Sequence, residues 1–203
     1  MQKSNVMKRF ISLFYMSIVV ISTFAQTIPT ESSHMTFKGV PIDGTLTDFV
    51  FKLKTHGFDK IQTKDGAAIL TGEFASFKRC LIGVHSLKQR DLVSQITVIF
   101  PEKEKWSNLS SDYFYLRDLL TEKYGKPAET IQKFDTYSEP DDDSSKLYAV
   151  QFDNCKYSTT YETEKGTIQL MIDHTGVSSC YVRLTYFDEI NGNLIRKKAM
   201  EDL

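Results

Sequence analysis

Residue types that commonly carry chemistry are present in this 203-residue chain, but their spacing matches no recognised catalytic or metal-binding pattern. None of the four histidines belongs to an HExxH or HxH pattern, which would bring two imidazoles to one metal ion. The acidic run Asp141–Asp143 lacks the alternate ligands and the central glycine of an EF-hand loop, so we expect a solvated loop. The sequence before Cys180 lacks the second glycine of a nucleophile elbow. We therefore predict no catalytic residue, no bound metal and no cofactor.

A second group of residues has the types that are favoured at recognition surfaces. They combine an aromatic ring, a guanidinium, an ammonium, amides and a hydroxyl, at alternate positions of segments that we expect to be β-strands. On one face of a rigid sheet, such side chains can hold a protein or peptide partner; an ordinary solvated sheet face is the alternative. The candidate binding residues are Lys156, Gln169, Tyr181, Arg183, Gln95 and Thr97.

The amino-terminal segment, residues 1–25, has the pattern of a cleavable secretory signal. Lys3, Lys8 and Arg9 precede a short apolar run, and a small-residue cleavage site ends at Ala25. An uncleaved anchor is the alternative, although the apolar run is short against the ~20 residues of a spanning helix. We expect a periplasmic or secreted protein that has no membrane contact after cleavage and no lipid anchor.

Composition narrows the classes of partner. Without residues 1–25 and their three positive charges, 22 Lys and Arg remain against 26 Asp and Glu, a net charge of −4. Because the basic residues are interleaved with acidic ones, no basic stripe is available to neutralise nucleic-acid phosphates. We expect no nucleic-acid partner, and the oligomeric state stays open at this level.

The positioning elements follow from periodicity and turn residues. Thr45 caps a predicted helix that ends at His56–Gly57, and Asp65–Gly66 is a hairpin signal between two strands. A second helix begins after Ser110 or Ser111 and ends at Gly125. We predict strands at residues 58–64, 67–74, 77–87, 92–100, 128–137, 147–162, 166–173 and 179–187, with an acidic loop at 138–146.

This order suggests an internal duplication. We predict an α+β fold made by tandem duplication of a helix followed by a four-stranded antiparallel sheet, with the helices packed on one sheet face. The two compact halves are expected to share a continuous sheet or core. The predicted boundaries are a signal peptide at 1–25, a flexible lead-in at 26–36, a first half at 37–105, and a second half at 106–203 that includes a carboxy-terminal tail.

Strand register in the second half predicts two chemically different faces. A tight turn near residues 162–165 would place Tyr161 opposite Gly166, and a turn around Gly176 would place Ile172 near Cys180. One face is then apolar and aromatic, whereas the other carries the candidate binding residues. The alternation is typical of an antiparallel sheet that is covered on one side only.

The three cysteines cannot all pair within one chain. In a simple meander Cys155 and Cys180 lie two strand spacings apart, about 9–10 Å, which exceeds the ~7 Å that a disulfide tolerates between Cα atoms. We predict a disulfide between Cys80 and Cys155, which hold equivalent positions in the two halves. Free, buried thiols that behave as small apolar residues are the alternative.

Five segments carry a resemblance to known proteins: FKGVPIDGTL, the FxxC stretch, VIFPEKEKW, KYGKP and EINGNLIRKKAMEDL. Together they resemble an uncharacterised family of small secreted Bacteroidetes proteins, and this resemblance implies no activity and no catalytic residues. The layout is more loosely similar to the β-lactamase-inhibitor-protein fold and to small outer-membrane assembly lipoproteins. That similarity implies a concave sheet able to hold a protein partner.

Three hypotheses for function are open from sequence. The first is a secreted or periplasmic protein-binding module that uses the polar sheet face. The second is a hydrolase of envelope or other polymers with an unrecognised carboxylate site, which the many acidic residues would permit. The third is a structural component of the cell envelope.

Overall fold

The structure is a computed structural model that describes residues 32–87, 91–201 and 203. The predicted signal peptide lies outside the described residues, as do residues 26–31 of the predicted lead-in. Ser32–Leu203 forms one compact unit.

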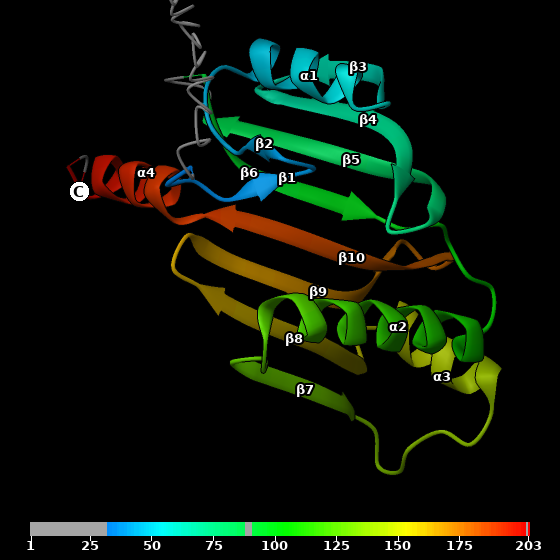
Figure 1. Cartoon of the computed structure of the whole chain (residues 1–203). Helices are drawn as coiled ribbons and strands as arrows, with labels where there is room; N and C mark the ends of the chain where they lie inside the picture. The colour runs from blue at the N-terminus through cyan, green and yellow to red at the C-terminus, as the bar shows by residue number, and fades with distance from the viewer. Residues whose placement is uncertain (1–31, 88–90, 202) are drawn as a thin grey trace, which may run out of the picture. The chain divides into compact units, whose positions relative to one another are not determined.

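One antiparallel sheet of eight strands dominates this unit (Figure 1). Its order is β3-β4-β5-β6-β10-β9-β8-β7, so the pairing of β6 with β10 joins the earlier strands to the later ones. The strands are β3 (Asp59–Lys64), β4 (Ala67–Phe74), β5 (Phe77–Leu87), β6 (Leu92–Ile99), β7 (Glu129–Phe134), β8 (Cys155–Thr163), β9 (Gly166–Thr175) and β10 (Ser179–Asp188).

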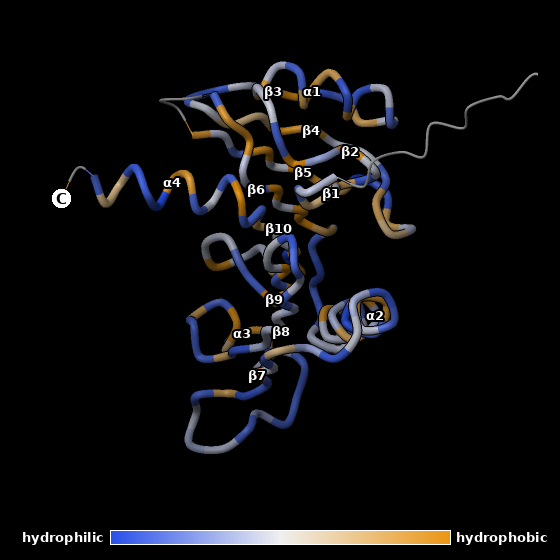
Figure 2. The backbone as a smooth tube through the Cα atoms, turned by 60° about the vertical axis from the view of Figure 1, so that its left-hand side comes forward, coloured by the Kyte–Doolittle hydropathy of each residue, from blue (hydrophilic) through white to orange (hydrophobic). Residues whose placement is uncertain are grey.

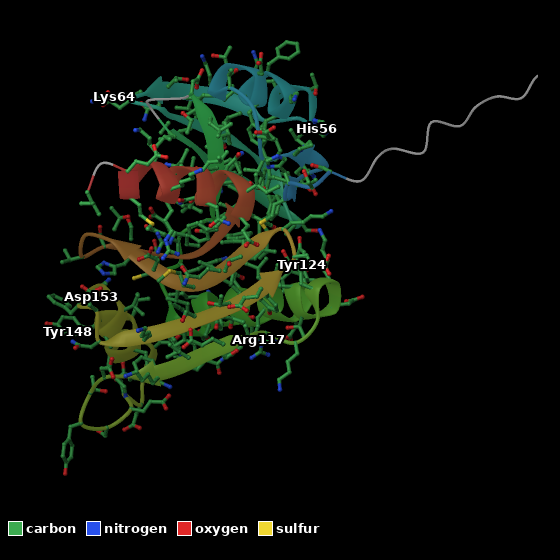
Figure 3. All side chains as sticks on the ribbon, turned by 90° about the vertical axis from the view of Figure 1, so that its left-hand side faces the viewer. His56, Lys64, Arg117, Tyr124, Tyr148 and Asp153 are labelled. Carbon is green, nitrogen blue, oxygen red and sulfur yellow. The ribbon has the colours of Figure 1, made fainter. Side chains whose placement is uncertain are left out.

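A short hairpin and the described helices flank the sheet. The hairpin, α1 and α2 lie on one side of the sheet, and α4 projects from the other side (Figure 2). Figure 3 shows Tyr148 and Asp153, at the carboxy-terminal end of α3, far from Tyr124 at the end of α2. The elements are β1 (Thr36–Phe37), β2 (Val40–Pro41), α1 (Leu46–Thr55), α2 (Trp106–Tyr124), α3 (Asp143–Gln151) and α4 (Glu189–Glu201).

The predicted fold class is wrong. Instead of a duplicated helix with a four-stranded sheet, the chain forms a single eight-stranded sheet, a separate two-stranded hairpin and, among the described residues, four helices. Helix α3 interrupts the second series of strands, and the predicted carboxy-terminal tail contains α4. The helices do not share one sheet face either, because α4 leaves on the side opposite α1 and α2 (Figure 2).

Local signals explain the elements that were predicted correctly. The Thr45 hydroxyl accepts a hydrogen bond from the Asp48 backbone N–H at 3.1 Å, which caps α1 as predicted. The Asp65–Gly66 hairpin between β3 and β4 is also confirmed. Helix α2, however, begins one turn before the predicted serine cap, because Trp106 packs edge-on against Phe134 and Tyr157 and is buried there.

The predicted strand at residues 147–162 is wrong in its first part. Asp142 accepts a hydrogen bond from the Ser145 backbone N–H at 2.9 Å, and this cap starts α3 at Asp143. The helix buries Ala149 and Val150, and β8 begins only at Cys155. The apolar residues at the start of the predicted strand therefore belong to a short capped helix, and they do not show the regular alternation of a strand.

The described part of the predicted flexible lead-in is ordered by tertiary contacts. Met35 is 5% exposed, and its backbone N–H donates to the buried carboxylate of Asp188 at 2.8 Å. The neighbouring His34 imidazole lies 3.0 Å from the same carboxylate. These partners are more than 150 residues away in sequence, so local composition did not indicate them.

The observed register in the second half differs from the prediction by two residues. Thr163, and not Tyr161, lies opposite Gly166, and Cys180 lies opposite His174. The β8–β9 turn is shorter than expected, since only two residues separate the strands. A shift by two keeps every side chain on its predicted face, so the separation into two faces is confirmed.

The predicted disulfide between Cys80 and Cys155 is wrong. All three cysteines are free, and β5 is separated from β8 by β6, β10 and β9. Four strand spacings correspond to about 19 Å, far beyond the reach of a disulfide. The thiols are buried or partly buried small apolar groups.

These thiols lead to a prediction about reactivity. Burial raises the pKa of Cys80 to about 11 and that of Cys155 to about 12, and it raises the pKa of Cys180. Because the thiolate is the reactive form, we expect Cys80 and Cys155 of the folded protein to react with Ellman's reagent at pH 8 at least about 100-fold more slowly than a small thiol. Three equivalents should be released in denaturant.

The same shifts set the expected pH dependence of stability. In the unfolded chain a thiol ionises near its ordinary pKa of 9.0, whereas Cys155 in the folded chain ionises only near about 12. The free energy of unfolding should therefore be insensitive to these thiols below pH 9 and decrease between pH 9 and 12. A thiol of the folded protein that titrates rapidly at pH 8 would contradict both expectations.

Candidate functional site

The sheet face turned away from α1 and α2 carries the residues that the sequence indicated as a binding surface. Alternate side chains of each strand point to this face, and the register aligns them in rows across the strands; Thr185, for example, lies between Thr97 and Gln169. We call this surface the open face. Its residues include Leu81, Gly83, His85, Gln95, Thr97, Ile99, Lys156, Ser158, Thr160, Thr167, Gln169, Met171, Asp173, Tyr181, Arg183, Thr185 and Phe187.

All six candidate residues lie on the open face, but their accessibility differs. Tyr181 is 7% exposed and Thr97 is 8% exposed, so both act mainly as parts of the sheet. The remaining candidates keep part or most of their side chains accessible: Lys156, Gln169, Arg183 and Gln95. Their role in binding stays a prediction.

Arg183 is a charged group of the open face that contacts on the neighbouring strand hold in place. Its Nε lies 2.8 Å from Asp173 Oδ2, and its Nη2 lies beside the sulfur of Met171 on the neighbouring strand. The guanidinium is partly exposed, so it retains donors that can meet a carboxylate of a partner. The ion pair with Asp173 reduces the rotamer entropy that Arg183 would lose on binding.

Tyr181 has a structural role in the sheet, and its role in recognition stays a prediction. Its hydroxyl shares a hydrogen bond with Thr175 Oγ1 at 2.8 Å across the β9–β10 hairpin. Gln95 is likewise turned toward its own strand, because its Nε2 donates to Thr97 Oγ1 at 3.3 Å. These hydrogen bonds hold the side chains of Tyr181 and Gln95 in place on the open face.

Two apolar side chains of the open face were missed by the sequence analysis. Leu81 is 40% exposed and Phe187 is 39% exposed, and they lie on either side of the row that contains Gly83, Thr97 and Thr185. Short side chains in that row leave the flanks of the larger ones accessible. The pairing of β6 with β10 is the observation that brings them to one surface, and no local signal indicates it.

Hollows lie at two places along the open face. One, of about 440 Å³, lies where Phe187 and Thr167 meet the first turns of α4, and its lining includes the carboxylates of Glu162 and Glu189. The other, of about 400 Å³, is lined by Arg79, Leu81, Ile99, Phe100, Pro101 and Glu102. Each hollow thus places an apolar side chain of the open face beside charged groups.

The described residues offer little for metal or membrane chemistry. Within residues 32–87, 91–201 and 203, no group of three or more His, Cys, Asp or Glu side chains is placed to hold a metal ion. In the same part of the chain, no helix combines the length and the apolar character that crossing a bilayer requires.

Comparisons with protein-family models, with curated proteins and with solved structures find no match to this chain. The resemblance to a Bacteroidetes family and to the β-lactamase-inhibitor-protein fold therefore stays a prediction.

Proposed function

We propose that this protein is an exported, non-enzymatic binding protein that holds a protein or peptide partner on the open face. One observation carries the proposal: a positioned arginine and two exposed apolar side chains share one face of a rigid antiparallel sheet that α1 and α2 leave uncovered. Arginine and aromatic side chains are the residue types that most often anchor protein interfaces.

The arrangement favours a partner of mixed chemistry. Arg183 offers a fixed guanidinium to an acidic group, while Leu81 and Phe187 offer apolar contact within the same surface. Between them, the buried Thr97 and Thr185 have little freedom left to lose on binding. A preorganised surface of this kind reduces the entropic cost of association.

The test compares two double variants with equal added charge. We expect Leu81→Glu/Phe187→Glu to reduce recovery of partners from an envelope extract by at least about tenfold, because two anchors are replaced by carboxylates. The matched control, Phe51→Glu/Leu119→Glu, alters side chains of α1 and α2 that are 68% and 38% exposed. It should recover the partners as the unaltered protein does.

The readout is quantitative mass spectrometry of the captured proteins, with circular dichroism to show that both variants are folded. Equal losses in the two variants, or full recovery by the open-face variant, would refute binding through this surface. A peptide identified in this way can then be titrated directly against the Arg183→Gln variant.

A further inference from the structure

Strand β7 is one of the two edges of the eight-stranded sheet. It pairs with β8 through six consecutive residues, from Glu129↔Thr160 to Phe134↔Cys155, and the register is uninterrupted. On its other side, no described strand pairs with it. A regular edge strand presents a row of backbone N–H and C=O groups that can pair with another strand.

The sequence of β7 is complementary to itself when two copies run antiparallel. With Ile131 on the two-fold axis, Ile131 lies opposite Ile131 of the second copy, and Glu129 lies opposite Lys133. Thr130 then lies opposite Gln132. In this register odd-numbered residues lie opposite odd-numbered ones, and even-numbered residues lie opposite even-numbered ones. Because alternate residues direct their backbone N–H and C=O groups to the same side of a strand, the outward groups of one strand meet those of the other. Two cross-strand pairs of opposite charge flank a central apolar pair.

We propose that β7 is a dimerisation edge at which a second copy of this chain pairs antiparallel about Ile131, which joins two sheets into one. The proposal is independent of the proposed binding function. In this register five residues of each β7 strand pair with the other strand, which is a small interface, so the complex is expected to be weak, with a Kd on the order of 100 µM.

Two neighbouring elements limit where this partner can lie. Helix α2 packs against β8, β9 and β10. In the dimer the two β7 strands would therefore lie between helix α2 of one copy and helix α2 of the other. The connection to α3 leaves from the end of β7 (Figure 1). Lys133 already contacts Asp135 of its own chain, but an ammonium group has three donors and can also accept Glu129 of the second copy as a partner.

The opposite edge does not have these properties. Strand β3 pairs with β4 through a register that shifts between Lys60 and Gln62, so its outward backbone groups are not evenly spaced. A bulge at an edge is a device that prevents strand addition. Its exposed apolar residue Ile61 therefore provides a matched control for Ile131.

The first experiment is disulfide trapping at the two-fold axis. Residues directly opposite in an antiparallel pair have Cα atoms about 4.5–5.5 Å apart, within the range of a disulfide. Under mild oxidation, Ile131→Cys should form the linked dimer at least about tenfold faster than Ile61→Cys at equal concentration. Mass spectrometry should place the new bond between the two introduced cysteines.

The second experiment tests the register by charge. Glu129→Lys places two lysines opposite each other in each contact of a homodimer, and Lys133→Glu places two acidic residues there. Mixing the two variants, both carrying Ile131→Cys and one carrying a size tag, restores opposite charges at both contacts. More than about three quarters of the trapped dimers should then be mixed, against half for random pairing.

Either of two results would overturn the proposal. Equal trapping rates for Ile131→Cys and Ile61→Cys would mean that β7 does not pair preferentially. Random pairing in the mixture would mean that the strands do not meet in this register. Circular dichroism of each variant shows that the sheet is intact.

Discussion

Replacing Asp188 with alanine should lower the free energy of unfolding by about 3 kcal/mol, because removal of this buried carboxylate leaves the three groups that it contacts without their hydrogen-bond acceptor. Asp188 is 1% exposed at the end of β10, and its Oδ1 accepts the Asn191 backbone N–H at 2.9 Å, which starts α4. The same carboxylate accepts the Met35 N–H at 2.8 Å and contacts His34 at 3.0 Å. One side chain therefore joins the start of the described chain, β10 and α4.

Urea unfolding followed by circular dichroism measures this effect. Asp188→Asn, which retains one acceptor oxygen, should lose less stability than Asp188→Ala. The control is Asp118→Ala, whose exposed side chain pairs with its neighbour Arg117 and should change stability by less than about 0.5 kcal/mol when it is removed. If Asp188→Ala is no more destabilising than this control, the contacts of Asp188 with Met35, His34 and Asn191 do not stabilise the fold as we expect.

Replacing Gly166 with alanine should destabilise the fold by at least about 3 kcal/mol, since the new methyl group has no space. Gly166 has a φ of +143°, and an ideal Cβ there would overlap the carbonyl oxygen of Phe187. The same Cβ would lie 3.0 Å from the Glu189 nitrogen and 3.0 Å from the Met35 sulfur. Backbone atoms on one side prevent relief by a change of rotamer.

Gly176 separates this packing effect from backbone strain. Its φ is +60°, and an added Cβ would meet nothing within 4 Å. Gly176→Ala should therefore cost only about 1 kcal/mol, which is the strain of a left-handed residue. Thermal unfolding of the two variants side by side gives the comparison, and similar losses would show that the close approach at Gly166 is relieved by movement of the chain.

The elements predicted correctly share a local cause. The Thr45 cap, the Asp65–Gly66 hairpin and the glycine at the end of α2 each depend on residues within a few positions of one another. The alternation of β8, β9 and β10 also survived an error of two residues in register, because side-chain direction has a period of two.

The errors have a different cause. Asp142 caps α3 where apolar residues suggested a strand, and Trp106 extends α2 because its ring is buried against Phe134 and Tyr157. The disulfide prediction assumed that Cys80 and Cys155 meet in a duplicated fold, whereas three strands separate them. In the last two cases contacts between distant segments determined the outcome, whereas the Asp142 cap is a local signal, made with Ser145 three residues on, that the strand prediction overlooked.

On the open face, too, some features follow from local sequence and others depend on the pairing of strands. Alternation along single strands was sufficient to place Arg183 and Gln169 on one polar face. It did not reveal that Tyr181 is anchored to Thr175, or that Leu81 and Phe187 flank the same row of short side chains. The Tyr181–Thr175 contact lies within the β9–β10 hairpin, whereas the placement of Leu81 and Phe187 requires the register between β6 and β10, which residues far apart in the chain establish.

The sequence by itself determined the Thr45 cap, the Asp65–Gly66 turn and the two-sided chemistry of the strands, because these depend on short-range geometry and on the period of the backbone. Only the tertiary structure decided that all the long strands form one sheet, that β7 and β3 are its edges and that the thiols stay apart. The physical reason is that burial and strand pairing between distant segments, which no local pattern encodes, select among several locally acceptable arrangements.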